Sequence, residues 1–146
     1  MGELPHIKNE LIEGETFISA IMKPHTSYYK SVKGLFESGK IKGMAHITGG
    51  GIEGNLKRII PNGLCANIDL DKIKILPLFK YIKNNGNISE NEMLSTFNCG
   101  VGLAVVVSPE HSNSVAKHIS QYHNCYPIGE VSSGTNDVGF KNKLVW

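Results

Sequence analysis

The sequence predicts a domain of the α/β or α+β class, with one mixed β-sheet flanked by helices. Three observations lead to this prediction. Segments in which apolar and polar residues alternate take turns with segments whose apolar residues recur every three to four positions. The chain has 146 residues, of which 40% are hydrophobic and 19% charged, so it can bury a core. No repeat or low-complexity stretch divides it, so residues 1–146 are expected to form a single domain.

The first half of the chain predicts two helices followed by a strand. Residues 15–22 are expected to form a short helix, because the residue before Pro24 is pushed out of the helical region. Residues 26–38 carry an apolar face at helical spacing, and Gly39 suits the position just past the end of a helix. Residues 41–47 alternate, with small and apolar side chains on one side, which is typical of a strand.

Helices and strands continue to alternate after the three glycines at 49–51. Pro77 and Pro109 suit the first turn of a helix. Ser89, followed three residues later by Glu92, is a capping box. The uncharged run Val101–Val107 predicts a strand buried on both faces. The remaining expected elements are helices at 52–60, 77–86, 90–96 and 109–122 and strands at 64–70, 126–131 and 138–145.

Composition excludes several classes of function. Lys plus Arg number 15 and Asp plus Glu 13, and this net charge of +2 argues against binding nucleic acid or anionic membrane through bulk charge. The three cysteines are odd in number and widely spaced, which fits neither a disulfide framework nor a zinc knuckle. The longest apolar run is far shorter than the roughly 20 residues that span a bilayer, and no secretory signal opens the chain. We therefore expect a cytoplasmic protein with no nucleic-acid or membrane partner.

The most informative segment is A-H-I-T-G-G-G-I, in which an expected strand leads through three glycines into a helix. Glycines let a ligand approach the backbone closely, and the free N–H groups of a helix start attract anions. A plain tight turn explains the same pattern without a ligand. His46 is a candidate catalytic residue, able to donate to a phosphate or to carry a proton, or else a structural histidine. The candidates for phosphate binding are Thr48, Gly49, Gly50 and Gly51.

The second candidate segment, F-N-C-G-V-G at 97–102, joins an expected helix to the apolar strand. Asn98 can cap the helix or bond a ligand, and Gly100 permits close backbone approach. Helix termination and packing explain the same residues. Cys99 has no base in a recognisable motif with it, so a small buried thiol is the better interpretation. The histidines other than His46 form no cluster in the sequence, and no metal site is expected.

Five segments occur in a suggestive order: A-H-I-T-G-G-G at 45–51, N-L-K-R-I-I-P at 55–61, G-N-I-S-E-N-E-M at 86–93, T-F-N-C-G-V-G at 96–102 and Y-P-I-G-E-V at 126–131. Together they resemble the carboxy-terminal domain of the aminoimidazole ribonucleotide synthetase family, also called phosphoribosylformylglycinamidine cyclo-ligase. The resemblance runs from about residue 15 to residue 131 and implies that domain's α/β fold.

The resemblance also implies an activity in de novo purine biosynthesis. ATP phosphorylates the formyl amide oxygen of formylglycinamidine ribonucleotide, the amidine nitrogen attacks that carbon, and phosphate leaves as the imidazole ring closes. The family implies magnesium, a homodimer and a cleft between two domains. By matching position, the loop at 48–51 would cradle a phosphate, His46 would border the cleft, and Asn98 with Gly100 would line its wall.

The sequence departs from the family pattern in several places. The amino-terminal domain, which would bind most of the ATP and magnesium, has no counterpart, so this chain alone is expected to be inactive. Gly54 stands where an acidic residue is usual, Lys57 where proline is usual, and His25-Thr26 replaces a common Thr-Arg. Two alternatives therefore stay open. One is a non-catalytic phosphate-binding or interaction module of the same fold, and the other is a fragment of a related synthetase such as formylglycinamidine ribonucleotide synthetase.

Overall fold

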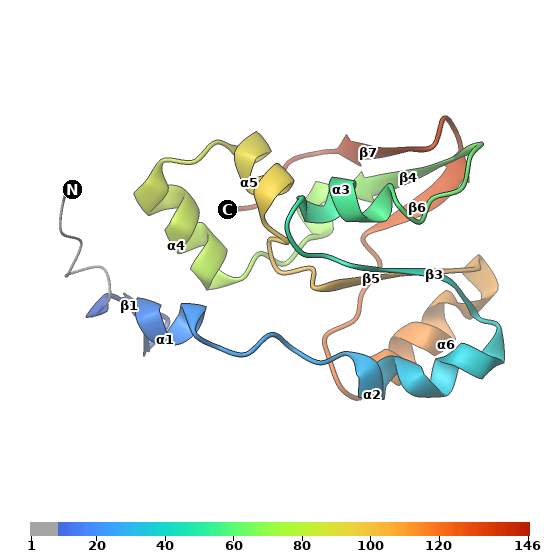
Figure 1. Cartoon of the computed structure of the whole chain (residues 1–146), viewed down its shortest axis with the longest axis horizontal. Helices are drawn as coiled ribbons and strands as arrows, with labels where there is room; N and C mark the ends of the chain where they lie inside the picture. The colour runs from blue at the N-terminus through green and yellow to red at the C-terminus, as the bar shows by residue number, and fades with distance from the viewer. Residues whose placement is uncertain (1–8) are drawn as a thin grey trace.

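The computed structural model describes residues 9–146 and contains helices and strands in alternation, so the predicted α+β class is confirmed. Figure 1 shows the course of the chain. The α-helices are α1 (Phe17–Ile21), α2 (Tyr29–Val32), α3 (Gly51–Leu56), α4 (Pro77–Gly86), α5 (Glu90–Thr96) and α6 (Pro109–Ile119), and the 3-10 helices are η2 (Lys33–Ser38) and η3 (Leu70–Lys72). The strands are β1 (Leu11–Ile12), β2 (Glu15–Thr16), β3 (Ile41–His46), β4 (Leu64–Asp69), β5 (Leu103–Val107), β6 (Gly129–Ser133) and β7 (Asp137–Lys141).

The prediction of one mixed sheet is wrong for the described residues, because the strands form three separate sheets. β1 and β2 make a small hairpin, and β3 pairs with β5 in antiparallel fashion. β4 lies between β6, which is antiparallel to it, and β7, which is parallel. The division falls between β5 and β6, whose facing edges border a common cavity instead of bonding to each other.

Two hydrophobic clusters hold the fold together. The larger one joins the inner faces of β4 and β7 to α3 and α5, and Ile47, Ile52 and Met93 in it are completely buried. The smaller one lies between the β3–β5 pair and the helices α2, η2 and α6, which appear below that pair in Figure 1. Val115 and Ile119 of α6 belong to it. The β3–β5 pair therefore forms the middle layer between two sets of helices.

Local sequence signals set most helix ends where they were expected. The Ser89 capping box is present, with Ser89 Oγ accepting from the Glu92 N–H and the Glu92 carboxylate accepting from the Ser89 N–H. Pro77 and Pro109 open α4 and α6. Gly39 takes a left-handed φ of 65° at the end of η2. No helix among residues 9–146 is long and apolar enough to cross a bilayer.

Other boundaries differ from expectation. The expected helix at 26–38 begins only at Tyr29 and tightens into the 3-10 helix η2, and the residues before it run as an extended linker. The segment at 15–22 is shared between β2 and α1, because Glu13 and Gly14 adopt left-handed conformations that turn β1 back on β2.

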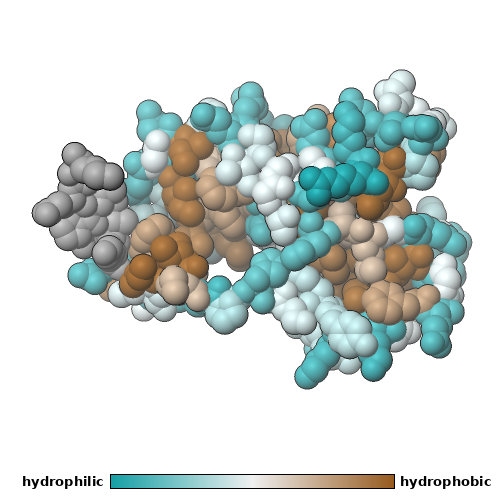
Figure 2. Space-filling view, in the orientation of Figure 1, coloured by the Kyte–Doolittle hydropathy of each residue, from teal (hydrophilic) through white to brown (hydrophobic). Residues whose placement is uncertain are grey.

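Figure 2 shows hydrophobic residues gathered around α1 and α4, where Met22 is 72% exposed.

Candidate functional site

The loop from Thr48 to Gly51 connects the end of β3 to the start of α3. The Gly51 N–H donates to the Thr48 carbonyl at 3.1 Å, which closes a tight turn. Gly50 has a φ of 92° and Gly51 a φ of 62°, and residues other than glycine rarely adopt this left-handed backbone conformation. Gly49 has an ordinary conformation, and a Cβ atom there would meet nothing within 4 Å. The three glycines therefore have different structural requirements.

Asn55 holds this loop from inside. Its side chain is buried, and its Nδ2 donates to the Gly51 carbonyl at 2.7 Å and to the Gly49 carbonyl at 3.2 Å. The loop carbonyls are thus occupied by Asn55. The N–H groups of Gly49 and Gly50 make no hydrogen bond to any residue from 9 to 146, and both glycines are exposed. Two backbone donors are therefore available to an anion. Sequence reasoning missed Asn55, whose only signal is its position one helical turn after Gly51.

Gly51 has a packing role that distinguishes it from the other two glycines. A Cβ atom on Gly51 would lie 1.8 Å from the carbonyl oxygen of Leu94 in α5. Only glycine lets α3 and α5 approach this closely, and the Gly51 N–H is already bonded within the turn. This residue shapes the loop, while Gly49 and Gly50 carry its free donors.

Asn98 connects the two candidate segments, which are about fifty residues apart in the sequence. Its Nδ2 donates to the Ile47 carbonyl at 3.4 Å, and its Oδ1 accepts from the Gly100 N–H at 2.9 Å. Gly100 has a φ of 107°, and a Cβ atom there would lie 2.7 Å from the Lys74 carbonyl. The fold therefore brings Asn98 and the glycine loop together, while Gly100 fits closely against neighbouring backbone.

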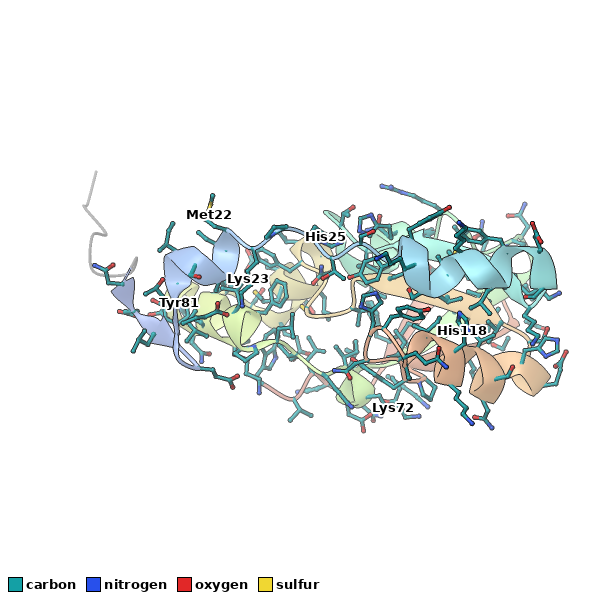
Figure 3. The ribbon with its side chains drawn as sticks, turned by 90° about the horizontal axis from the view of Figure 1, so that it is seen from below. Met22, Lys23, His25, Lys72, Tyr81 and His118 are labelled. Atoms are coloured by element: carbon teal, nitrogen blue, oxygen red, sulfur yellow. The ribbon has the colours of Figure 1, made fainter. Side chains whose placement is uncertain are left out.

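His46 lies at the end of β3 with its side chain exposed, and a second imidazole meets it there. The Nε2 atoms of His46 and His25 are 2.7 Å apart, a hydrogen-bond distance in which one nitrogen donates and the other accepts. His25 belongs to the extended linker between α1 and α2, near the middle of the molecule in Figure 3. The expectation that the other histidines form no cluster is wrong for His25, because the linker crosses the end of β3.

Tyr28 packs beside this histidine pair. Its ring makes edge contacts with His25 and His123, with ring centroids 5.7 Å and 5.2 Å away. Burial raises the pKa of its hydroxyl, so Tyr28 remains protonated at neutral pH. A Cβ atom on Gly102 would lie 1.8 Å from the Tyr28 hydroxyl oxygen, so that glycine makes room for the ring. Tyr28 also occupies the N-cap position of α2, where its side chain makes no capping hydrogen bond.

A hollow of about 340 Å³ opens beside His46 and the glycine loop. Arg58 borders it, and the guanidinium makes no ion pair with any acidic side chain in the described part of the chain. Its neighbour Lys57 is instead paired with Asp137 at 3.2 Å. A cationic group, an imidazole and a hydroxyl thus border one polar hollow, which suits an anionic ligand. The lining residues are Met44, Ala45, His46, Thr48, Asn55, Arg58 and Ile59.

Cys99 takes no part in this surface. It is completely buried, and burial together with the charge of Glu90 raises the pKa of its thiol to about 11. A protonated, inaccessible thiol cannot act as a nucleophile at neutral pH. Within residues 9–146 no three His, Cys, Asp or Glu side chains gather as metal ligands.

Comparison with known proteins places the chain in a family. Residues 6–141 match the model of the family described as AIR synthase related protein, C-terminal domain. The chain belongs to this family. The AIR synthase C-terminal domain therefore contains both candidate segments, the glycine loop and the Asn98 turn, within its matched span.

Named relatives of this domain are longer proteins. The chain is 40% identical over 130 residues to the chloroplastic phosphoribosylformylglycinamidine cyclo-ligase of Arabidopsis thaliana, covering 88% of this chain and 33% of that protein. It is 42% identical over 115 residues to the cyclo-ligase of Geobacillus kaustophilus, covering 78% and 33%. It is 37% identical over 133 residues to the bifunctional purine biosynthetic protein purD of Dictyostelium discoideum, covering 90% and 16%. The chain thus spans about a third or less of these relatives.

Proposed function

We propose that this chain supplies the carboxy-terminal domain of a phosphoribosylformylglycinamidine cyclo-ligase, which closes the imidazole ring of aminoimidazole ribonucleotide at the expense of ATP. Relatives named phosphoribosylformylglycinamidine cyclo-ligase, about 40% identical over most of the chain, support the proposal. The structural observation that carries it is the pair of free N–H groups at Gly49 and Gly50, which follow Thr48 in the loop, and Thr48 lines the same hollow as Arg58. Backbone amides, a hydroxyl and a guanidinium are the donors that bind a phosphate monoester.

In this proposal the phosphate of the ribonucleotide binds at the loop formed by Thr48, Gly49 and Gly50, with Arg58 as counter-charge. Gly51 shapes the loop through its contact with α5. Asn98 and Gly100 form the adjoining wall, joined to the loop by the bond from Asn98 to the Ile47 carbonyl. The residues that would contact the ribonucleotide then come from two segments, which the hydrogen bond from Asn98 to Ile47 holds side by side.

We assign His46 to proton transfer. Ring closure makes the attacking amidine nitrogen give up a proton, and a neutral imidazole at the edge of the hollow can accept it. His25 acts as a positioning residue, because its Nε2 lies 2.7 Å from that of His46 and a hydrogen bond between them couples the tautomers of the two rings.

The nucleotide is expected to bind mainly outside this chain. ATP and magnesium are needed for the phosphorylation step, and no group of three acidic, His or Cys ligands occurs in residues 9–146. We propose that this domain does not turn over substrate alone, because ATP binds mainly to the remainder of the longer protein. The remainder of the longer protein, the ribonucleotide and a second subunit of a homodimer are the proposed partners. A cytoplasmic location remains a prediction, and the Arabidopsis relative is named as chloroplastic.

Substitution of Gly49 by Val tests the loop. A Cβ atom at Gly49 meets nothing within 4 Å and the backbone there is unstrained, so the variant folds while its side chain covers the free donors. Gly50→Val is less clean because the φ of 92° strains any side chain. We expect ribose 5-phosphate, titrated by NMR, to bind the 146-residue chain and to bind Gly49→Val at least tenfold more weakly.

Gly54→Val is the matched control, since Gly54 lies in α3 with open space at its Cβ position. Its affinity for ribose 5-phosphate should equal that of the parent chain. Unchanged affinity in a folded Gly49→Val variant would show that the loop is only a turn.

A second experiment tests the inactivity of the isolated domain, and in it the chain is incubated with ATP, magnesium and formylglycinamidine ribonucleotide. Detection of aminoimidazole ribonucleotide would overturn the proposed inactivity of the isolated domain.

A further inference from the structure

Strand β5 has the sequence of an interior strand and the position of an edge strand. Its residues are Leu-Ala-Val-Val-Val, a continuous apolar run of the kind found in strands with neighbours on both sides. In the described structure it pairs only with β3. Ala104 is its only buried residue, and the remaining four are half-buried. Edge strands of soluble proteins usually carry a charge or a proline that blocks further pairing, and β5 has neither.

Strand β6 presents a second free edge. It pairs with β4 alone, and all five of its residues, Gly129–Ser133, are exposed. Val131 is 38% exposed, although the neighbouring β4 positions Ala66 and Ile68 are buried. The apolar side chain in the middle of this edge therefore lacks a covering neighbour.

The two free edges line one groove. Its volume is about 750 Å³, and residues of β5 and β6 form much of its wall, with Ala66 and Ile68 also contributing. In an antiparallel pair, alternate residues direct their N–H and C=O groups away from the partner strand. None of the outward groups of β5 or β6 bonds to another residue in the range 9–146. A groove with apolar walls and unpaired backbone groups on both sides is complementary to extended polypeptide, which satisfies both.

We propose that one extended strand of further polypeptide inserts between β5 and β6 and bonds to both, which joins the two sheets in the order β3-β5-insert-β6-β4-β7. The strand carries apolar side chains that fill the groove. Its source is the polypeptide that precedes this domain in the longer proteins of the family, because the family is defined as a C-terminal domain and the chain covers 33% of its Geobacillus relative.

No strand among residues 9–146 of a second copy supplies this insert. An inserted strand needs both of its edges free, and each of β3 to β7 already uses at least one edge. β1 and β2 have two residues each and pair with each other. The occupant is therefore a segment outside the described fold. This inference concerns the assembly of the domain and does not depend on the proposed reaction.

Overlapping 15-residue peptides that cover the amino-terminal part of the Geobacillus kaustophilus cyclo-ligase provide the test. Each is added to the 146-residue chain, and backbone hydrogen exchange is followed by mass spectrometry. We expect one peptide, or a few that overlap, to slow exchange at least tenfold in both Leu103–Val107 and Gly129–Ser133. Exchange there is rapid in the free chain because the outward groups are unpaired.

Two variants sharpen the result. Val131→Asp places a charge on the free edge of β6 and should weaken binding of the protecting peptide at least tenfold, measured by fluorescence anisotropy. Val145→Asp is the control, since Val145 is 62% exposed and lies outside the groove. Thermal melts check that both variants fold. The proposal is overturned if no peptide protects both strands, if protection falls elsewhere, or if the free chain protects them by self-association at higher concentration.

Discussion

The three consecutive glycines should respond to alanine in sharply different ways. At Gly51 a Cβ atom would lie 1.8 Å from the Leu94 carbonyl oxygen, so α5 must move by more than 1 Å to restore an ordinary contact. A left-handed alanine costs about 1–2 kcal/mol, and forced overpacking costs about 1–3 kcal/mol. Gly51→Ala should therefore lower the free energy of unfolding by roughly 2–5 kcal/mol, a large part of the ~5–15 kcal/mol typical of a domain.

The neighbouring glycines calibrate this number. At Gly50 the φ of 92° is strained for alanine, but the nearest atom would be 3.9 Å from its Cβ, so Gly50→Ala should cost only about 1–2 kcal/mol. At Gly49 the space is open and the conformation ordinary, so Gly49→Ala should be neutral or stabilising by less than about 1 kcal/mol. Urea unfolding followed by circular dichroism gives all three values. Equal midpoints for Gly51→Ala and Gly49→Ala would refute the reasoning about the contact with α5.

Two further predictions concern titrating groups. A hydrogen bond from Asn142 and the nearby charge of Lys141 hold the pKa of Asp69 down to about 2. The ionised Asp69 therefore stabilises the fold above pH 4, and this contribution is lost as the pH falls toward 2. Urea midpoints of the Asp69→Asn variant should depend less on pH in that window than those of the parent chain. Cys99, with its pKa raised to about 11, should react with a disulfide reagent at pH 8 at least a hundredfold more slowly in the native chain than in urea. The half-buried Cys65 and Cys125 should be labelled before it, and rapid native labelling of Cys99 would contradict its burial.

Short-range signals predicted the elements that depend on them. The capping box at Ser89 gave the correct bounds of α5, and Pro77 gave the start of α4, because caps and proline act within one turn. The helix expected at 26–38 begins only at Tyr29, because the preceding linker crosses the end of β3 and places His25 against His46. Tertiary contact outweighed local propensity there.

The candidate site was predictable only in part. The glycine loop and Asn98 both stand out in the sequence, and the bond from Asn98 to Ile47 shows that they are neighbours. Nothing in the sequence indicated that His25 meets His46, since the pair depends on the path of the linker. Asn55 was missed because an asparagine inside a helix looks unremarkable until its bonds to loop carbonyls are seen.

The prediction of a single sheet was wrong for a similar reason. Alternation and apolar runs identify strands one at a time, while their order depends on which edges meet. The run Val101–Val107 was expected to be buried on both faces, and β5 is instead mostly half-buried beside the groove. The apolar run is therefore typical of a strand that is more deeply buried than β5 is among residues 9–146.

The close approach of Gly51 to Leu94 has a consequence for protein engineering. A designer who grafts this glycine loop onto another scaffold cannot transfer residues 48–51 alone, because Asn55 of α3 bonds the loop carbonyls and Gly51 packs against the Leu94 carbonyl of α5. The smallest portable unit is the loop together with α3 and α5. Evolutionary exchange of such loops between proteins should meet the same restriction, with both helices inherited as one block.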